Sequence, residues 1–177
     1  MKRKLFNLKI IVALAMLSAI SIVCGKYLAI NVGEAMRFSL ESMPIIFAGV
    51  AFGPIAGGLV GLVADIVGCL MVAYTINPLI ALGAALIGLI SGAMPLALSK
   101  ITDSEKITTI ASVFAAHFIG SVLVKTVGLS AYYDMPFTIL LLWRALNYLI
   151  VGALDSAVVY VLLHNKGIQM QLKELKK

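Results

Sequence analysis

The sequence predicts an all-α polytopic membrane protein, a bundle of six transmembrane helices forming one membrane-embedded domain over residues 1–177. The hydrophobic fraction is 62% and the charged fraction only 12%, about half the charged share of a soluble domain. Too little polar sequence therefore remains to coat the apolar side chains in water. The apolar residues also gather in runs near the roughly 20 residues that a helix needs to cross a bilayer, with short polar segments between them.

Each expected span corresponds to one such run. The run at 8–24 follows a basic start, and the next is short because Gly53-Pro54 ends it. A polar segment at 74–78 separates the third run from the fourth, and a polar loop at 99–106 separates the fourth from the fifth. A turn at 132–136 precedes the last run, and a charged tail follows it. We therefore expect spans at residues 8–24, 40–52, 55–73, 79–98, 107–129 and 137–163.

The basic residues predict the orientation. Six spans place both termini on one side, and that side collects ten of the fourteen Lys and Arg residues, counting the two tails and the loop before residue 107. Cytoplasmic loops carry an excess of Lys and Arg. The chain is thus expected to be a multi-pass protein of the cell membrane with cytoplasmic termini, and the loops holding Arg37, Asn77 and Asp134 are expected outside.

Polar side chains inside the spans indicate a binding site, because such groups are costly in lipid and are usually functional. Lys125 lies near the outer end of the fifth span, and Arg144 and Asn147 lie near the outer start of the sixth. Antiparallel neighbours would bring the two cations to a similar depth, which favours an anionic solute. The structural alternatives are that Lys125 snorkels to the interface and that Arg144 pairs with Asp134.

Asp65 lies on a helix face with three glycines, Gly57, Gly61 and Gly68. Small residues at such spacing let helices approach closely, so we expect Asp65 to face protein rather than lipid. It would then bind a ligand or form a structural pair within the bundle.

The outer loops add further candidates. Arginine clamps carboxylates with paired hydrogen bonds, and an amide suits the edge of a heterocycle. Aromatic belts are common at this depth, so each aromatic residue is either an interface anchor or a stacking platform. The candidates are Arg37, Phe38, Ser39, Tyr74, Asn77, Tyr133 and Trp143.

The sequence lacks the motifs of several enzyme classes. There is no GxxxxGK[ST] phosphate loop, no HExxH or GxSxG motif, and no His/Cys cluster of metal-ligand spacing among its two histidines and two cysteines. We therefore expect no catalytic residues, no metal and no cofactor of its own. The basic residues lie at the edges of apolar runs and form no basic face interleaved with aromatic residues, so we also expect no nucleic-acid partner.

Several motifs resemble one transporter family. The first span carries Ala15-x-x-x-Ala19, which is similar to the alanine motif by which the substrate-binding S components of energy-coupling-factor (ECF) vitamin transporters dock on their coupling subunit. Residues 37–44, 52–54 and 64–65 are similar to the folate-specific FolT members of that family. Tyr74-Thr-Ile-Asn77-Pro78 and Arg144-x-x-Asn147 extend the match over nearly the whole chain.

The resemblance implies a substrate-binding subunit rather than an enzyme. It would bind folate at the outer face and deliver it inward with a membrane coupling protein and two ATPases, which hydrolyse the ATP. The cations would meet the two folate carboxylates, and Asp65, Asn77 or Asn147 would meet the pterin. The alternatives are an S component for riboflavin, pantothenate, thiamine or a queuosine precursor, and a small membrane enzyme or assembly factor.

Overall fold

A computed structural model of the chain describes residues 7–32, 36–133 and 136–175, with the side chains of residues 31, 32, 36, 37 and 133 set aside. It is helical apart from one short antiparallel hairpin, in which Asn31 pairs with Arg37, so the all-α prediction is confirmed. The elements are α1 (Leu8–Ile22), the π-helix η1 (Val23–Tyr27), β1 (Ile30–Val32), β2 (Met36–Phe38), α2 (Ser42–Phe52), α3 (Pro54–Met71), α4 (Pro78–Leu98), α5 (Glu105–Ala116), the π-helix η2 (His117–Val124), α6 (Lys125–Tyr133), α7 (Phe137–His164) and α8 (Lys166–Leu175).

The described residues include five helices that are long and apolar enough to cross a membrane: Leu8–Tyr27, Pro54–Met71, Pro78–Leu98, Glu105–Tyr132 and Phe137–His164. The remaining predicted span corresponds to α2, which has only 11 residues. At 1.5 Å per residue it extends about 16 Å, roughly half of the hydrocarbon core. The expectation of six full spans is therefore not confirmed.

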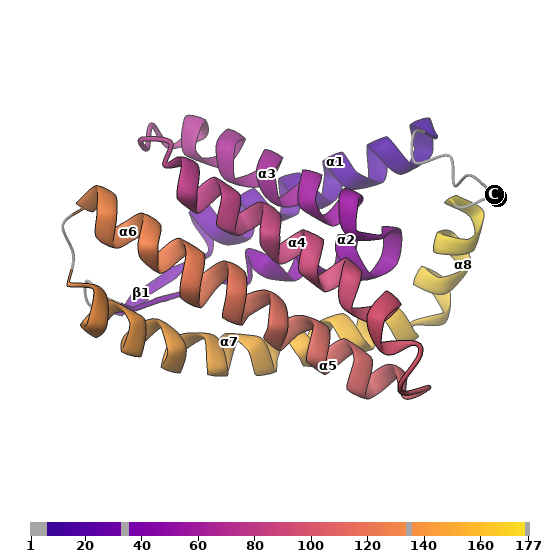
Figure 1. Cartoon of the computed structure of the whole chain (residues 1–177). Helices are drawn as coiled ribbons and strands as arrows, with labels where there is room; N and C mark the ends of the chain where they lie inside the picture. The colour runs from indigo at the N-terminus through magenta and orange to yellow at the C-terminus, as the bar shows by residue number, and fades with distance from the viewer. Residues whose placement is uncertain (1–6, 33–35, 134–135, 176–177) are drawn as a thin grey trace.

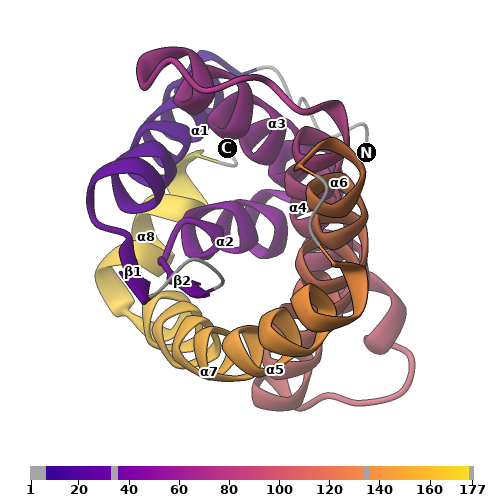
Figure 2. The same cartoon turned by 90° about the vertical axis from the view of Figure 1, so that its left-hand side faces the viewer.

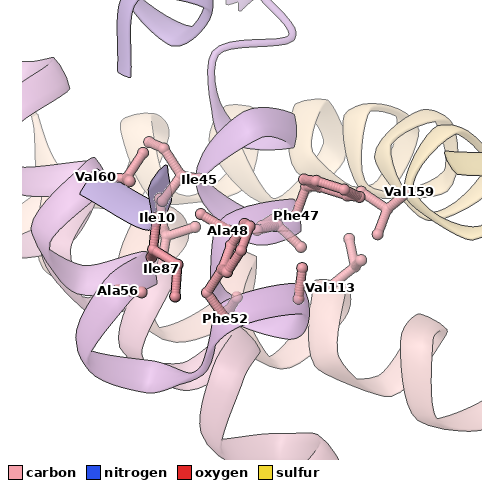
Figure 3. Packing of buried hydrophobic residues seen from close by; sticks show 13 residues of the cluster. Ile10, Ile45, Phe47, Ala48, Phe52, Ala56, Val60, Ile87, Val113 and Val159 are labelled. Atoms are coloured by element: carbon pink, nitrogen blue, oxygen red, sulfur yellow. The ribbon is translucent and has the colours of Figure 1, made fainter. Parts of the chain in front are cut away.

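The short helix α2 lies in the middle of the bundle. Viewed along the bundle, α1, α3, α4, α6 and α7 surround it (Figure 2). Nine of its 11 residues are buried, and its neighbours include Ile10, Val60, Ile87, Val113 and Val159 (Figure 3). Because protein rather than lipid surrounds α2, its length need not match the bilayer. It ends at Gly53, whose φ of 103° suits glycine and lets α3 turn back along the bundle.

The chain runs back and forth between two ends of the bundle (Figure 1). One end holds the strands β1 and β2, the α3–α4 turn, the end of α6 and the start of α7, and we call it the hairpin end. The other end holds the start of α1, the α4–α5 loop and α8, and we call it the tail end. The described residues nearest both termini therefore lie at the same end, as an even number of passes requires.

Glycines bring α3 and α4 into backbone contact. A Cβ on Gly57 would lie 2.5 Å from the carbonyl oxygen of Gly88, and Gly61 lies against the backbone of Ala84. Gly68 instead faces η1, where a Cβ would lie 2.9 Å from Cε of Lys26. This packing orients the polar side of α3 toward the bundle interior, as the glycine spacing predicted.

The helix from Glu105 to Tyr133 is continuous but contains eight residues of π-helix, η2. Its i→i+5 hydrogen bonds differ from those of the α-helix expected from the sequence, and such segments occur frequently at functional sites. The backbone N–H of Lys125 donates to Gly120 O at the end of η2. The π-helix therefore lies immediately before the lysine that the sequence singled out.

Candidate functional site

A buried ion pair at the hairpin end joins the loop before α2 to the start of α6. Lys125 Nζ lies 3.2 Å from Glu41 Oε1, and Lys125 is only 5% exposed. The lysine stem crosses Gly83 of α4, where a Cβ would lie 2.6 Å from Lys125 Cγ. Ser21 Oγ donates to the Glu41 backbone carbonyl at 2.6 Å, and a Cβ on Gly25 would lie 2.5 Å from Glu41 Oε2. The pair thus connects α1, η1, α2, α4 and α6.

A small cavity lies beside this ion pair. Asp65 of α3 and Lys26 of η1 line it together with Glu41 and Lys125. Its volume of about 20 Å³ has room for about one water molecule, whereas small-molecule pockets measure several hundred Å³. Asp65 Oδ2 is buried and has no hydrogen-bond partner among the described residues. Two carboxylates and two ammonium groups therefore share one narrow polar space.

Arg144 of α7 faces the π-helix η2. Its Nε and Nη2 donate to the carbonyl oxygen of Ser121 at 3.1 and 2.7 Å, and its guanidinium carbon lies 5.2 Å from the centre of the Tyr148 ring. A carbonyl carries no net charge, and no carboxylate of the described residues forms an ion pair with Arg144. Among the described residues, the guanidinium is therefore held by a neutral carbonyl and an aromatic ring.

The structure brings several of the predicted site residues together. The helix α7 packs against η2 and α6, so the prediction that Lys125 and Arg144 come from adjacent antiparallel segments is confirmed. Asn147 is buried on α7, one turn beyond Arg144. Lys125 does not snorkel to the interface, because its ammonium group is paired inside the bundle. Asp65 faces the same interior.

Other predicted residues occupy the periphery or serve the fold. Asn77 caps α4: its Oδ1 accepts from the backbone N–H groups of Leu79 and Ile80, and its Nδ2 donates to Gly128 O at 2.9 Å. Tyr74 is 60% exposed, with Lys26 Nζ 5.6 Å from its ring centre. The amide of Asn77 therefore already has partners within the protein.

The remaining candidates surround the hairpin end. Trp143 is 43% exposed, while Phe38 and Ser39 are half-buried. The side chains of Arg37 and Tyr133, and the whole of Asp134, lie outside the described residues, so the predicted pairing of Arg144 with Asp134 stays a prediction. Arg37 itself occupies β2, opposite Asn31.

A second polar network lies deeper in the bundle. His117 Nε2 and Asp155 Oδ2 are 2.9 Å apart, and His117 Nδ1 lies 3.2 Å from Ser121 Oγ. The three residue types match a nucleophilic triad, but all three side chains are 0–1% exposed, so a substrate has no path to the serine hydroxyl. The network instead connects η2 to α7 by hydrogen bonds inside the bundle, while Asp155 Oδ1 is buried without a partner among the described residues. Among the described residues, no cluster of three His, Cys, Asp or Glu side chains suits a metal ion.

The sequence reasoning missed Glu41 and Lys26 as site residues. Both occur in the polar stretch between the first two apolar runs, where their charges only indicated a loop. Glu41 is 84 residues from its partner Lys125, and no sequence periodicity connects them. The available signal was their position at the outer edges of apolar runs, the same signal that identified Lys125.

The first helix presents small residues outward. Ala15 and Ala19 are exposed on α1, beside the exposed apolar side chains of Met16 and Ile20. In the membrane this stripe faces lipid or another protein, and its small residues allow the close approach of a second helix.

Comparison with known proteins identifies the family. The model of the substrate-specific component of ECF transporters matches residues 9–163, whereas no curated protein matches the chain. A crystal structure of FolT bound with folic acid superposes with a TM-score of 0.71 at 22% identity, over 88% of this chain and 93% of that one. The S component of a bacterial ECF transporter superposes with a TM-score of 0.66 at 21% identity, over 94% and 97%. The helical bundle around α2 is thus the S-component fold, and the chain belongs to the family of substrate-specific components of ECF transporters.

Proposed function

We propose that this S component binds folate at the hairpin end of the bundle. The observation that carries the proposal is the pair of cationic groups, Lys125 and Arg144, that adjacent segments hold inside the apolar bundle. Folate carries a glutamate tail with two carboxylates, and each would form a charge-assisted hydrogen bond with one of these cations. The similar fold of FolT bound with folic acid supports the same ligand.

Asp65 supplies a complementary contact for the other part of the ligand. Its buried Oδ2 atom lacks a hydrogen-bond partner among the described residues, and a pterin ring offers N–H donors. A bound pterin would therefore satisfy an atom whose burial is otherwise costly. The aromatic side chains around the hairpin end, including Trp143, are the candidates for stacking on the ring.

The binding end is proposed to face outward. Lys9, Lys100, Lys106, Lys166 and Lys173 all belong to elements at the tail end, and the positive-inside rule assigns such an end to the cytoplasm. The chain would thus cross the cell membrane with both termini inside. The helix α2 would provide the sixth pass from within the bundle, although its 11 residues are too few to span the hydrocarbon core by themselves.

The exposed stripe at Ala15 and Ala19 is the proposed docking surface for the membrane coupling protein. The S component contributes the binding site, and two partner ATPases supply the energy by hydrolysing ATP. The narrow cavity beside Lys125 requires the hairpin end to open before a vitamin enters. A substitution on α1 could therefore impair docking on the coupling protein without impairing the opening of the hairpin end.

Isothermal titration of the detergent-purified chain with folate, riboflavin, thiamine and pantothenate tests the proposal. We expect sub-micromolar binding of folate and no binding of the other three. Binding of riboflavin or pantothenate instead of folate would agree with the S-component function but contradict folate as the ligand. Thiamine is itself a cation, so its binding would contradict the role of the two cationic side chains.

A further inference from the structure

The last helix, α8, has one apolar face. Ile168, Leu172 and Leu175 follow the i, i+4, i+7 spacing that places residues on the same side of a helix. Asn165, directly before α8, has an extended backbone, which ends α7 and lets α8 run crosswise over the tail end toward the start of α1 (Figure 1 and Figure 2). An amphipathic helix that runs crosswise to membrane spans lies at the level of the lipid headgroups.

An apolar groove lies between α8 and the bundle. No residue of α8 is buried, so its apolar face leaves space in front of α1 and α2. The groove has a volume of about 410 Å³, and Gln171 is the one polar residue among those that line it. It follows α2 from Met43 to Phe52. Met16 and Ile20 of α1, which also line it, are 62% and 45% exposed, so the groove is open along this edge.

The dimensions of the groove suit one hydrocarbon chain. The 11 residues of α2 extend about 16 Å, which is close to the share of one leaflet in a hydrocarbon core of roughly 30 Å. Spread over this length, the volume of the groove gives a mean cross-section of about 26 Å². An α-helix with its side chains is about 10–12 Å across, so its cross-section is about three times as large. The groove is therefore too narrow for a helix of a partner protein.

The groove also lies apart from the proposed docking surface for the coupling protein. On α1 the groove residues Ala13, Leu17 and Ile20 share one helix face, again with i, i+4, i+7 spacing. At 3.6 residues per turn, Ala15 and Ala19 point toward the opposite side of α1. A molecule in the groove would thus leave the exposed alanines accessible.

Basic side chains stand at the headgroup end of the groove. Lys9 lies one turn before Ala13 on α1, Lys166 and Lys173 belong to α8, and all three lysines are exposed. The charged residues of α1 and α8 are these three lysines and Glu174, so the local charge is positive. Basic pockets beside membrane helices bind the headgroups of anionic lipids.

We propose that the groove under α8 binds one acyl chain of an anionic phospholipid, whose phosphate lies between Lys9 and Lys173. The chain fills the space that the apolar face of α8 leaves open, and the phosphate connects the start of α1 to the end of α8. The inference requires that the protein resides in a membrane, and it is independent of which vitamin the protein binds.

Native mass spectrometry of the detergent-purified chain, titrated with single lipids, tests the proposal. We expect one phosphatidylglycerol to bind about ten-fold more tightly than phosphatidylcholine, whose headgroup carries no net charge. Lysophosphatidylglycerol, which has one acyl chain, should bind about as tightly as phosphatidylglycerol, and glycerol 3-phosphate, which has none, should not bind. Equal binding of phosphatidylglycerol and phosphatidylcholine would mean general adhesion of lipid to apolar surface and would overturn the proposal.

A groove-filling variant tests the position of the acyl chain. Ala13→Phe places a large side chain in the groove, and we expect it to lower the affinity for phosphatidylglycerol about ten-fold or more. Val12→Phe is the matched control on the neighbouring residue, because Val12 is 51% exposed and does not line the groove. Unchanged phosphatidylglycerol binding by a folded Ala13→Phe chain, together with lost association with the coupling protein, would assign the groove to that protein instead.

A charge variant tests the position of the phosphate and decides the matter if Ala13→Phe fails to fold. Lys9→Gln combined with Lys173→Gln should remove the preference for phosphatidylglycerol over phosphatidylcholine. Lys100→Gln combined with Lys106→Gln removes the same charge from the same end but outside the groove, and it should keep the preference. A preference that survives the first pair would overturn the proposed headgroup contact. Failure of the chain to bind folate would reject the vitamin and leave these expectations unchanged, because the lipid titrations contain no vitamin.

Discussion

Replacement of Arg144 by alanine separates a binding role from a structural one. The structure assigns Arg144 one bifurcated hydrogen bond to Ser121 O and a contact with the Tyr148 ring at 5.2 Å. A hydrogen bond from a charged donor contributes about 1.5–3 kcal/mol, and a partly exposed cation–π contact about 0.5–1 kcal/mol. The structural cost of Arg144→Ala in the ligand-free protein is therefore about 2–4 kcal/mol.

The ligand adds a second, independent cost. Truncating one partner of a buried charge pair lowers affinity by about 2–5 kcal/mol, which corresponds to a Kd about 30-fold to 4,000-fold higher. Isothermal titration with folate measures the Kd, and thermal unfolding without ligand measures the structural part. Lys106→Ala is the matched control, because Lys106 Nζ also lies 5.7 Å from the centre of a tyrosine ring, that of Tyr160, but at the tail end.

The two readouts decide between the roles. A large rise in Kd for Arg144→Ala, with a smaller rise for Arg144→Lys, would assign the guanidinium to the ligand. An unchanged Kd with a lowered unfolding temperature would refute this reasoning and leave Arg144 as the residue that stabilises η2. Because the charge of Arg144 has no carboxylate partner among the described residues, we expect the first result.

The remaining predictions concern other parts of the bundle. Lys125→Met should weaken folate binding by about 2 kcal/mol or more in the same titration, and an unchanged Kd would remove Lys125 from the site. Gly88→Leu should destabilise the protein by about 1–3 kcal/mol or more in thermal unfolding, because its Cβ has no room against α3; an unfolding temperature equal to the original would contradict the packing described here. Asp155→Ala should lower stability by about 1–3 kcal/mol, because it leaves buried His117 without its partner, yet keep the folate Kd; a large loss of affinity would move this network into the site. Ala15→Trp should leave folate binding intact and abolish uptake in cells that express the coupling complex, and normal uptake would exclude α1 as the docking surface.

Most of the helices could be predicted from the sequence because lipid imposes a length and a polarity on each span. The helix expected over 79–98 is Pro78–Leu98, and the helix expected over 137–163 is Phe137–His164. The exception is α2, whose apolar run is too short for lipid. Hydropathy could not show that its 11 residues would be covered by the other helices, because that depends on how distant segments pack.

The candidate site could be predicted only in part. Lys125 and Arg144 were identifiable because charges are rare inside apolar runs, and a short connection between two spans makes them antiparallel neighbours. Asn77 was identifiable as polar, but its role as the cap of α4 depends on the backbone conformation at one residue. Glu41 was identifiable only as a charge at the outer edge of an apolar run, and its pairing with Lys125 could not be predicted, since the two residues are 84 positions apart.

The amino-acid sequence alone determined that the chain resides in a membrane, where its helices run, and which end carries the buried cations. These properties follow from the transfer of each side chain between water and lipid, which depends on local composition. The tertiary structure alone decided that α2 lies at the centre, that η2 is a π-helix, and that Glu41 forms an ion pair with Lys125. Those properties depend on contacts between segments far apart in the chain. The free energies of such contacts cannot be deduced from the composition of any single run of residues.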